Sequence, residues 1–169
     1  ANFNYVSGEA LTMSTSIFAK LRGYFYQFGL GVKTGIDLPG ETTGIEGAST
    51  KAHIGNALDE AYGNYDGYTV MQLAQYISTI ANGGRRIQTH LLQSIRGTSK
   101  TGGLGRIKAE VTPNVLNTLH MTSAEKALVK EGLYDVVHGT HTYQTGCAFD
   151  TIKPATSAQT GTAPTSIKA

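Results

Sequence analysis

The stretch that most constrains the fold lies between Thr69 and Gly84. Its apolar residues recur at steps of three and four, the period of one face of an α-helix. Thr69 precedes them as a candidate N-cap, and Gly83-Gly84 follows as a stop signal. We therefore predict a helix that begins after Thr69, ends before Gly83 and buries one apolar face, formed by Val70, Leu73, Ala74, Ile77, Ile80 and Ala81.

The same period indicates two further helices. One begins at Thr122-Ser123 and ends before Gly139. The other ends at Phe28; a short helix over residues 9–13 is predicted before it, and the hydroxyl triplet between the two is suited to capping. The apolar stripe of this earlier helix consists of Ile17, Phe18, Leu21, Phe25 and Phe28.

Strand signals are weaker and more scattered. Four residues of one parity are apolar or hydroxylated, which predicts a strand over 87–95; they are Ile87, Thr89, Leu91 and Ile95. We expect a loop over 97–105, irregular chain over 107–118 around Pro113, and one short helix within an otherwise loop-like 44–66. Good helices, a few separated strands and no internal repeat indicate one α+β domain over residues 1–169, with helices packed on an antiparallel sheet.

Composition excludes several classes of function. The formal net charge is +2 without any basic run, so we expect no nucleic-acid partner. A single cysteine, Cys147, and five scattered histidines offer neither a disulfide framework nor metal-ligand spacing, so we expect no metal and no cofactor. No apolar run is long enough to cross a bilayer and the first residues show no signal-peptide pattern, so we expect the chain itself to be soluble.

A chemically suggestive stretch is Ser157–Ala163 near the C-terminus, which alternates small residues with hydroxyls. On an extended segment, small side chains and a central glycine let a ligand backbone approach closely. Hydroxyls of Thr160 and Thr162 could bind a carboxylate or a carbonyl. The stretch is suited to forming one wall of a peptide-binding cleft, although Thr-Gly-Thr is also ordinary turn chemistry.

Several blocks in order resemble the transpeptidase domain of class B penicillin-binding proteins, most closely the 2B type. The most specific blocks are Gly35–Glu41, which reads Gly-Ile-Asp-Leu-Pro-Gly-Glu, and Met71–Tyr76 together with Ile80–Gly84. Gly29-Leu30-Gly31, His138-Gly139-Thr140 and Thr160–Ala163 complete the resemblance. It implies a β-lactamase/transpeptidase-like fold and serine acyl transfer on peptidoglycan stem peptides, with β-lactam antibiotics as further ligands. It also implies a parent protein at the extracellular face of the cytoplasmic membrane.

The family places three motifs around one cleft: Ser-x-x-Lys with the acylated serine, Ser-x-Asn, and Lys-Thr-Gly-Thr. By position, Ser14-Thr15-Ser16 occupies the second motif, with Ser16 where asparagine is expected. The resemblance therefore makes Ser14 and Ser16 the candidate catalytic residues. Ser16 is too short to repeat the reach of an asparagine amide.

The third motif falls on the C-terminal stretch, with Gln159 where lysine is expected. This change removes a positive charge that would attract a substrate carboxylate. The candidate substrate-binding residues implied by the resemblance are Gln159, Thr160, Gly161 and Thr162.

The first motif is not found at its expected place, because no Ser-x-x-Lys lies among the thirteen residues before Ser14. We interpret residues 1–169 as an incomplete, C-terminal portion of the domain, lacking the N-terminal part that carries the nucleophile. Two alternatives remain open: a degenerate, non-catalytic binding or scaffold domain, and a β-lactamase-like hydrolase. The hydrolase reading lacks a deacylating carboxylate at a recognisable place.

Three other stretches spell a Ser-x-x-Lys or Lys-Thr-Gly motif, but we do not assign them to the active site. Ser123-Ala124-Glu125-Lys126 spells Ser-x-x-Lys, but it follows the second motif and begins a predicted helix, where serine before an acidic residue is ordinary capping. Lys33-Thr34-Gly35 runs into the Ile-Asp-Leu-Pro block, and Lys100-Thr101-Gly102 lies in a glycine-rich loop. Neither has the register expected of a strand at a cleft edge.

Overall fold

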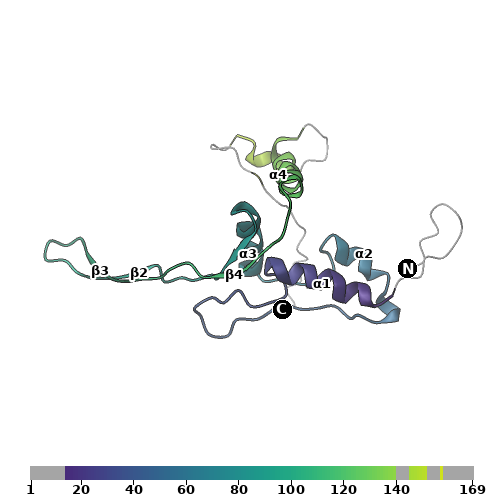
Figure 1. Cartoon of the computed structure of the whole chain (residues 1–169), viewed down its shortest axis with the longest axis horizontal. Helices are drawn as coiled ribbons and strands as arrows, with labels where there is room; N and C mark the ends of the chain where they lie inside the picture. Colours follow the sequence, from purple (N-terminus) through teal and green to yellow (C-terminus); the bar gives the residue numbers. More distant parts are fainter. Residues whose placement is uncertain (1–13, 140–144, 152–156, 158–169) are drawn as a thin grey trace, which may run out of the picture. The chain divides into compact units, whose positions relative to one another are not determined.

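The computed structural model describes residues 14–139, 145–151 and 157. The chain divides into two compact units, residues 1–119 and 120–169, which are described separately. In the first unit the helices come first and the antiparallel strands follow, so the predicted α+β class is confirmed (Figure 1). The first unit contains α1 (Ser16–Phe28), η1 (Lys51–His53), α2 (Asn56–Ala61), α3 (Val70–Ala81), β1 (Arg85–Ile87), β2 (Ser94–Thr98), β3 (Leu104–Glu110) and β4 (Val115–Thr118); the second contains α4 (Ser123–His138) and η2 (Cys147–Phe149).

Helix α1 packs through the aromatic residues of its predicted stripe. Phe18 is fully buried, and its ring centroid lies 5.7 Å from that of Tyr65. Phe28 meets Tyr76 of α3 edge-on at 5.7 Å, an arrangement that aromatic rings favour. The predicted short helix over residues 9–13 lies outside the described residues.

The C-terminal end of α1 requires a glycine. Gly29 has φ 96°, and its amide closes the helix by bonding to the carbonyls of Phe25 and Tyr26. A Cβ at this position would lie 2.3 Å from Oε1 of Gln75 on α3. Gly29 therefore satisfies both the left-handed backbone and the close approach of α1 to α3.

Helix α3 begins as predicted. The Thr69 hydroxyl accepts from the Gln72 amide at 3.2 Å, and Gln72 Oε1 accepts from the Thr69 amide at 2.9 Å, which completes a capping box. Gly84 donates back to Thr79 just beyond the last turn. The predicted helix and both of its boundary signals are thus confirmed.

The prediction that α3 buries its apolar stripe is wrong. Val70 is 83% exposed and Leu73 45%, whereas Gln72 and Gln75 are buried together with Thr79 and Ile80. The buried amides have partners: Gln72 Nε2 donates to Val32 O at 2.8 Å, and Gln75 Nε2 donates to Ile87 O at 2.8 Å. Val32 lies in irregular chain and Ile87 is the last residue of β1, and the inward amide side chains of α3 donate to the carbonyls of both.

The strands also differ from the prediction. Instead of one strand over 87–95, β1 ends at Ile87 and pairs antiparallel with β4, while β2 begins at Ser94 and pairs antiparallel with β3. Between them, Asp37 accepts from the amides of Leu91 at 2.7 Å and Leu92 at 3.1 Å. The Asp37 carboxylate accepts the hydrogen bonds that a neighbouring strand would otherwise accept. The alternation of side chains along residues 87–95 gives no sign of this contact.

Residues 107–118, predicted to be irregular, contain the end of β3 and all of β4. The predicted loop over 97–105 is the turn of the β2–β3 hairpin together with parts of both strands. The short helix expected within 44–66 is found as α2, which follows the single turn η1.

In the second unit, α4 carries a capping box in which Thr122 and Glu125 bond reciprocally. His138 is its last residue, and Nδ1 lies 2.5 Å from Oδ1 of Asp150.

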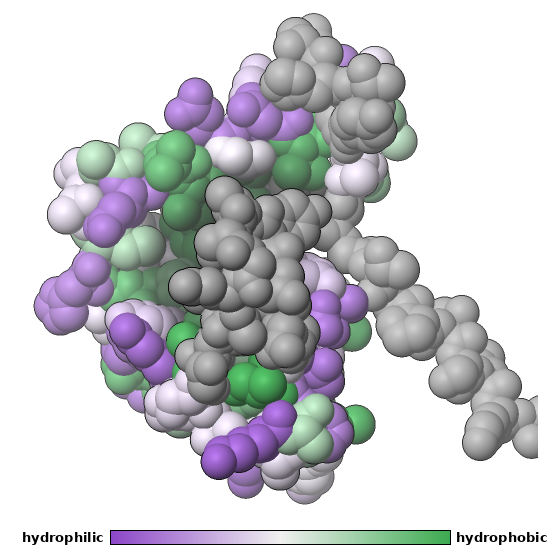
Figure 2. Space-filling view, turned by 90° about the vertical axis from the view of Figure 1, so that its right-hand side faces the viewer, coloured by the Kyte–Doolittle hydropathy of each residue, from purple (hydrophilic) through white to green (hydrophobic). Residues whose placement is uncertain are grey.

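No helix among the described residues combines the length and the apolar character that crossing a membrane requires. Hydrophobic side chains nevertheless reach the surface in several places, as the face in Figure 2 shows.

Candidate active site

The two predicted catalytic serines meet at the first turn of α1. Ser14 precedes the helix, Thr15 is its N-cap, and Ser16 is its first residue. The Ser16 hydroxyl donates to Ser14 Oγ at 2.9 Å, and the Ser16 amide donates to the same oxygen at 3.3 Å. Ser14 Oγ therefore accepts from an amide at the positive end of the helix dipole, which favours developing negative charge on that oxygen.

Both serines are exposed and line an open depression of about 410 Å³. Ile17 and Lys20 line the same depression. Lys20 lies four residues after Ser16, so both side chains project from one face of α1. A lysine beside two hydroxyls offers a positive charge to an anionic substrate group. Lys20 was not among the site residues predicted from the three family motifs.

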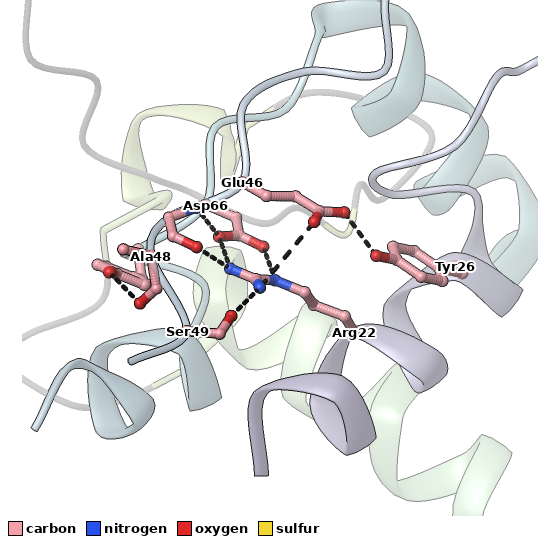
Figure 3. A network of polar contacts seen from close by, with 8 residues as sticks. Arg22, Tyr26, Glu46, Ala48, Ser49 and Asp66 are labelled. Atoms are coloured by element: carbon pink, nitrogen blue, oxygen red, sulfur yellow. Dashed lines mark hydrogen bonds and ion pairs between the residues drawn. The ribbon is translucent and has the colours of Figure 1, made fainter. Parts of the chain in front are cut away.

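A buried arginine fixes the helix that presents these serines (Figure 3). Arg22 is 6% exposed and Asp66 8%. Arg22 Nε donates to Asp66 Oδ2 at 2.7 Å and Nη2 to Asp66 Oδ1 at 2.7 Å, a bidentate pair. The guanidinium also donates to Ser49 Oγ at 2.6 Å and to Gly47 O at 2.8 Å. Helix α1 is thereby tied to two segments distant in sequence.

The pairing of Arg22 with Asp66 shifts the pKa of each residue in the direction that keeps it charged. Hydrogen bonding to Asp66 raises the pKa of Arg22 further above its already high value. Burial alone would raise the pKa of Asp66, but hydrogen bonds from Arg22 and the Gly47 amide outweigh it, so the net shift is downward. Both groups stay ionised inside the unit.

Glu46 extends this network toward the C-terminal end of α1. Its Oε1 accepts from the Tyr26 hydroxyl at 2.5 Å, and Oε2 lies 4.0 Å from Arg22 Nη1. The hydrogen bond to Glu46 raises the pKa of Tyr26 to about 12. Two positions one turn apart on α1 are thus held by neighbouring acids (Figure 3).

Glu60 on α2 is a second buried acid close to this network. It is fully buried, and neither of its carboxylate oxygens has a hydrogen-bond partner within the described residues. Burial, followed by the negative charge of Asp66, raises the pKa of Glu60 to about 7. An unpaired buried carboxylate is expensive, so this group takes up a proton more readily than an exposed glutamate.

The structure supports the interpretation of the literal motif matches that fall within it. Thr34 is fully buried, and Glu41 accepts from both its amide and its hydroxyl, which removes Lys33-Thr34-Gly35 as a cleft strand. Thr101 belongs to the β2–β3 turn, where its hydroxyl bonds Ser99. Ser123 is the first residue of the capped helix α4.

The third motif, Gln159, Thr160, Gly161 and Thr162, lies outside the described residues, so its placement relative to Ser14 and Ser16 stays a prediction. Of the predicted site, the structure therefore brings the two serines together and adds Lys20 beside them.

Comparison with known proteins decides the family. The model described as Penicillin binding protein transpeptidase domain matches residues 5–168. The chain belongs to this family. It is 46% identical over 160 residues to Penicillin-binding protein 2A of Bacillus subtilis (strain 168), covering 94% of this chain and 22% of that protein.

Members of the 2B type are also similar. Penicillin-binding protein 2B of Streptococcus pneumoniae serotype 2 is 39% identical over 149 residues, covering 88% of this chain and 22% of that protein. The solved structure of penicillin-binding protein 2B from Streptococcus pneumoniae strain 5204 superposes with a TM-score of 0.78 at 36% identity, covering 91% of this chain and 27% of that one. The transpeptidase fold is thus confirmed, and the chain spans about a fifth of the length of the curated relatives that it matches.

Proposed function

We propose that residues 1–169 are the C-terminal portion of the transpeptidase domain of a D,D-transpeptidase that cross-links peptidoglycan by serine acyl transfer. The match of the family over residues 5–168 carries this proposal. In such a reaction a serine hydroxyl attacks the carbonyl before the last residue of the stem peptide, and that residue leaves as a free amine while a serine ester forms. An amine of a second strand then takes the acyl group, which regenerates the serine hydroxyl. β-Lactam antibiotics would acylate the same serine.

The chain's own residues would bind and orient the substrate and move a proton. Ser14, hydrogen-bonded by Ser16, would assist proton transfer to or from the reacting groups. Thr160 and Thr162 would hold the carboxylate of the stem peptide or of a β-lactam. Lys20 would add positive charge close to Ser14. Gln159, at the position of the family's lysine, carries no such charge.

The nucleophile would come from polypeptide outside these 169 residues. The exposed apolar face of α3 supports this, since Val70, Leu73 and Ile77 are 83%, 45% and 36% exposed. Such a face is suited to packing against a further helix. The parent protein would act at the extracellular face of the cytoplasmic membrane, where peptidoglycan strands are joined.

A fluorescent penicillin tests this assignment directly. Incubated with the chain alone, it should give no covalently labelled band on a denaturing gel, because the acylated serine is missing. The parent protein under the same conditions should be labelled. A band from the chain alone that disappears in Ser123→Ala would overturn the proposal, because it would make Ser123 the nucleophile.

A second candidate is a non-catalytic binding or scaffold domain. Gln159 and Ser16 favour it, since each replaces a residue that the family uses at that position. The parent protein with Gln159→Lys separates the two: a scaffold gains acylation only when the lysine is restored. Efficient acylation of the parent with Gln159 in place would exclude the scaffold.

A further inference from the structure

The hairpin formed by β2 and β3, residues 94–110, projects from the rest of the first unit (Figure 1). Its sheet has two strands, so in the described part of the chain each strand has one edge without a strand partner. An isolated two-stranded hairpin is only marginally stable in water, and a third strand or a packed helix usually supports it. This hairpin is thus a sheet with room for another strand.

The hairpin carries an excess of positive charge. Its four basic residues face one acid, Glu110, which gives a net charge of +3. The whole chain has +2, so the other residues together carry −1. All four basic side chains are exposed, and none forms an ion pair with another described residue; they are Arg96, Lys100, Arg106 and Lys108.

Apolar side chains accompany these charges. Leu104 is 83% exposed, Ile95 48% and Ile107 41%. Ile107 lies opposite Arg96 in the ladder, so cation and apolar side chain share one face of the hairpin. The surface is therefore suited to a partner that offers both acidic and apolar side chains.

The two edges of the hairpin are unequal. Ile95 and Arg96 are one position apart on β2, but their partners on β3 are two positions apart. Arg96 and Thr98 are two positions apart, but their partners are three apart. Both inserted residues thus fall on β3, and such bulges interrupt an edge and discourage strand pairing. The β2 edge has no inserted residue.

The alternation of backbone groups identifies the free donors. Gln93 O accepts from Val111 N at 3.0 Å, so Gln93 faces the β3 side. In an antiparallel pair, N–H and C=O of one residue point the same way and successive residues alternate. The N–H groups of Ser94 and Arg96 therefore point to the outer edge of β2.

We propose that this edge of β2 binds an extended, acidic segment of a partner protein, which adds to the hairpin as a third strand. A protein strand satisfies the outward backbone groups, covers the exposed apolar side chains and neutralises the charge. A bilayer offers no backbone partners for an open sheet edge. A purely polar anionic polymer would leave the apolar side chains in water. This inference is independent of acyl transfer.

The test uses the full 169-residue chain and a seven-residue peptide of alternating valine and glutamate. We expect the peptide to bind at least tenfold more tightly than its counterpart with lysine in place of glutamate. Bound peptide should slow hydrogen exchange at the amides of Ser94 and Arg96 at least tenfold. Electrostatic attraction alone would leave both exchange rates unchanged and would overturn the proposal.

Two variants sharpen the test. Ser94→Pro removes one outward donor without removing a bond to β3, and it should weaken peptide binding about tenfold. Arg96→Glu should weaken it more, whereas Arg85→Glu, an exposed arginine outside the hairpin, should have no effect. Equal effects of the two charge reversals would contradict the proposal, as would binding to phosphatidylglycerol vesicles without binding to the acidic peptide.

Discussion

The surroundings of α1 and the β2–β3 hairpin use charged side chains in opposite ways. Arg22 is buried and paired bidentately with Asp66, while Arg96 is exposed and has no ion pair within the described residues. Around α1, charge fixes segments that are far apart in sequence. On the hairpin, charge stays available to a partner. The same residue type serves as scaffold or as contact surface according to what surrounds it.

The largest expected effect comes from breaking the buried pair. Asp66→Asn keeps the shape of the side chain but leaves the Arg22 guanidinium buried without a counter-charge, which should lower the free energy of unfolding by about 3–5 kcal/mol. Urea denaturation followed by circular dichroism measures it. The matched control on the hairpin, Glu110→Gln, should change stability by less than about 0.5 kcal/mol. Similar losses from both would erase the contrast between the regions.

A smaller loss is expected where a neutral polar group is buried. Gln75→Leu fills much of the same volume but removes the donor to the carbonyls of Thr34 and Ile87, which should cost about 1–3 kcal/mol in urea unfolding. Gln93→Leu, at an exposed position before β2, is the control and should be nearly neutral. A stabilising Gln75→Leu would show that the inward amides of α3 are dispensable.

The third effect is a dependence on pH. The folded pKa of Glu60, about 7, lies above its ordinary value of 4.5, so the native state binds more protons between these limits. Stability should therefore fall as pH rises from 4.5 to 7, by at most about 3 kcal/mol. Comparing urea midpoints at pH 5 and pH 8 measures the slope. Glu60→Gln should flatten it and Glu110→Gln should not; an unchanged slope in Glu60→Gln would refute the assignment.

Local signals in the sequence predicted where helices begin and end better than they predicted which neighbouring segments each element contacts. The capped start of α3 and its glycine stop depend on residues within one turn, and both were predicted. Which face of α3 is buried depends on carbonyls of residues 32–34 and 87, which lie outside the helix. The strand over 87–95 failed for a similar reason, because Asp37 takes the amides of Leu91 and Leu92.

In the candidate site, too, contacts between residues close in sequence could be predicted and contacts between distant residues could not. Ser14 and Ser16 are only two positions apart in sequence, and they were found in contact. Lys20 could have been found from its four-residue spacing to Ser16 on a helix. Arg22 and Asp66 are separated by 44 positions, and no local pattern connects them.

The place of Arg22 on α1 has a mechanical consequence. Six residues separate it from Ser16, about 9 Å along the axis at the usual helical rise. A helix of this length behaves as a stiff rod, so a tilt at Arg22 also displaces the end that carries Ser14 and Ser16. Substitutions around residues 46–66 should thus shift the two serine hydroxyls from a distance, and with them the acyl transfer that we propose for the parent protein.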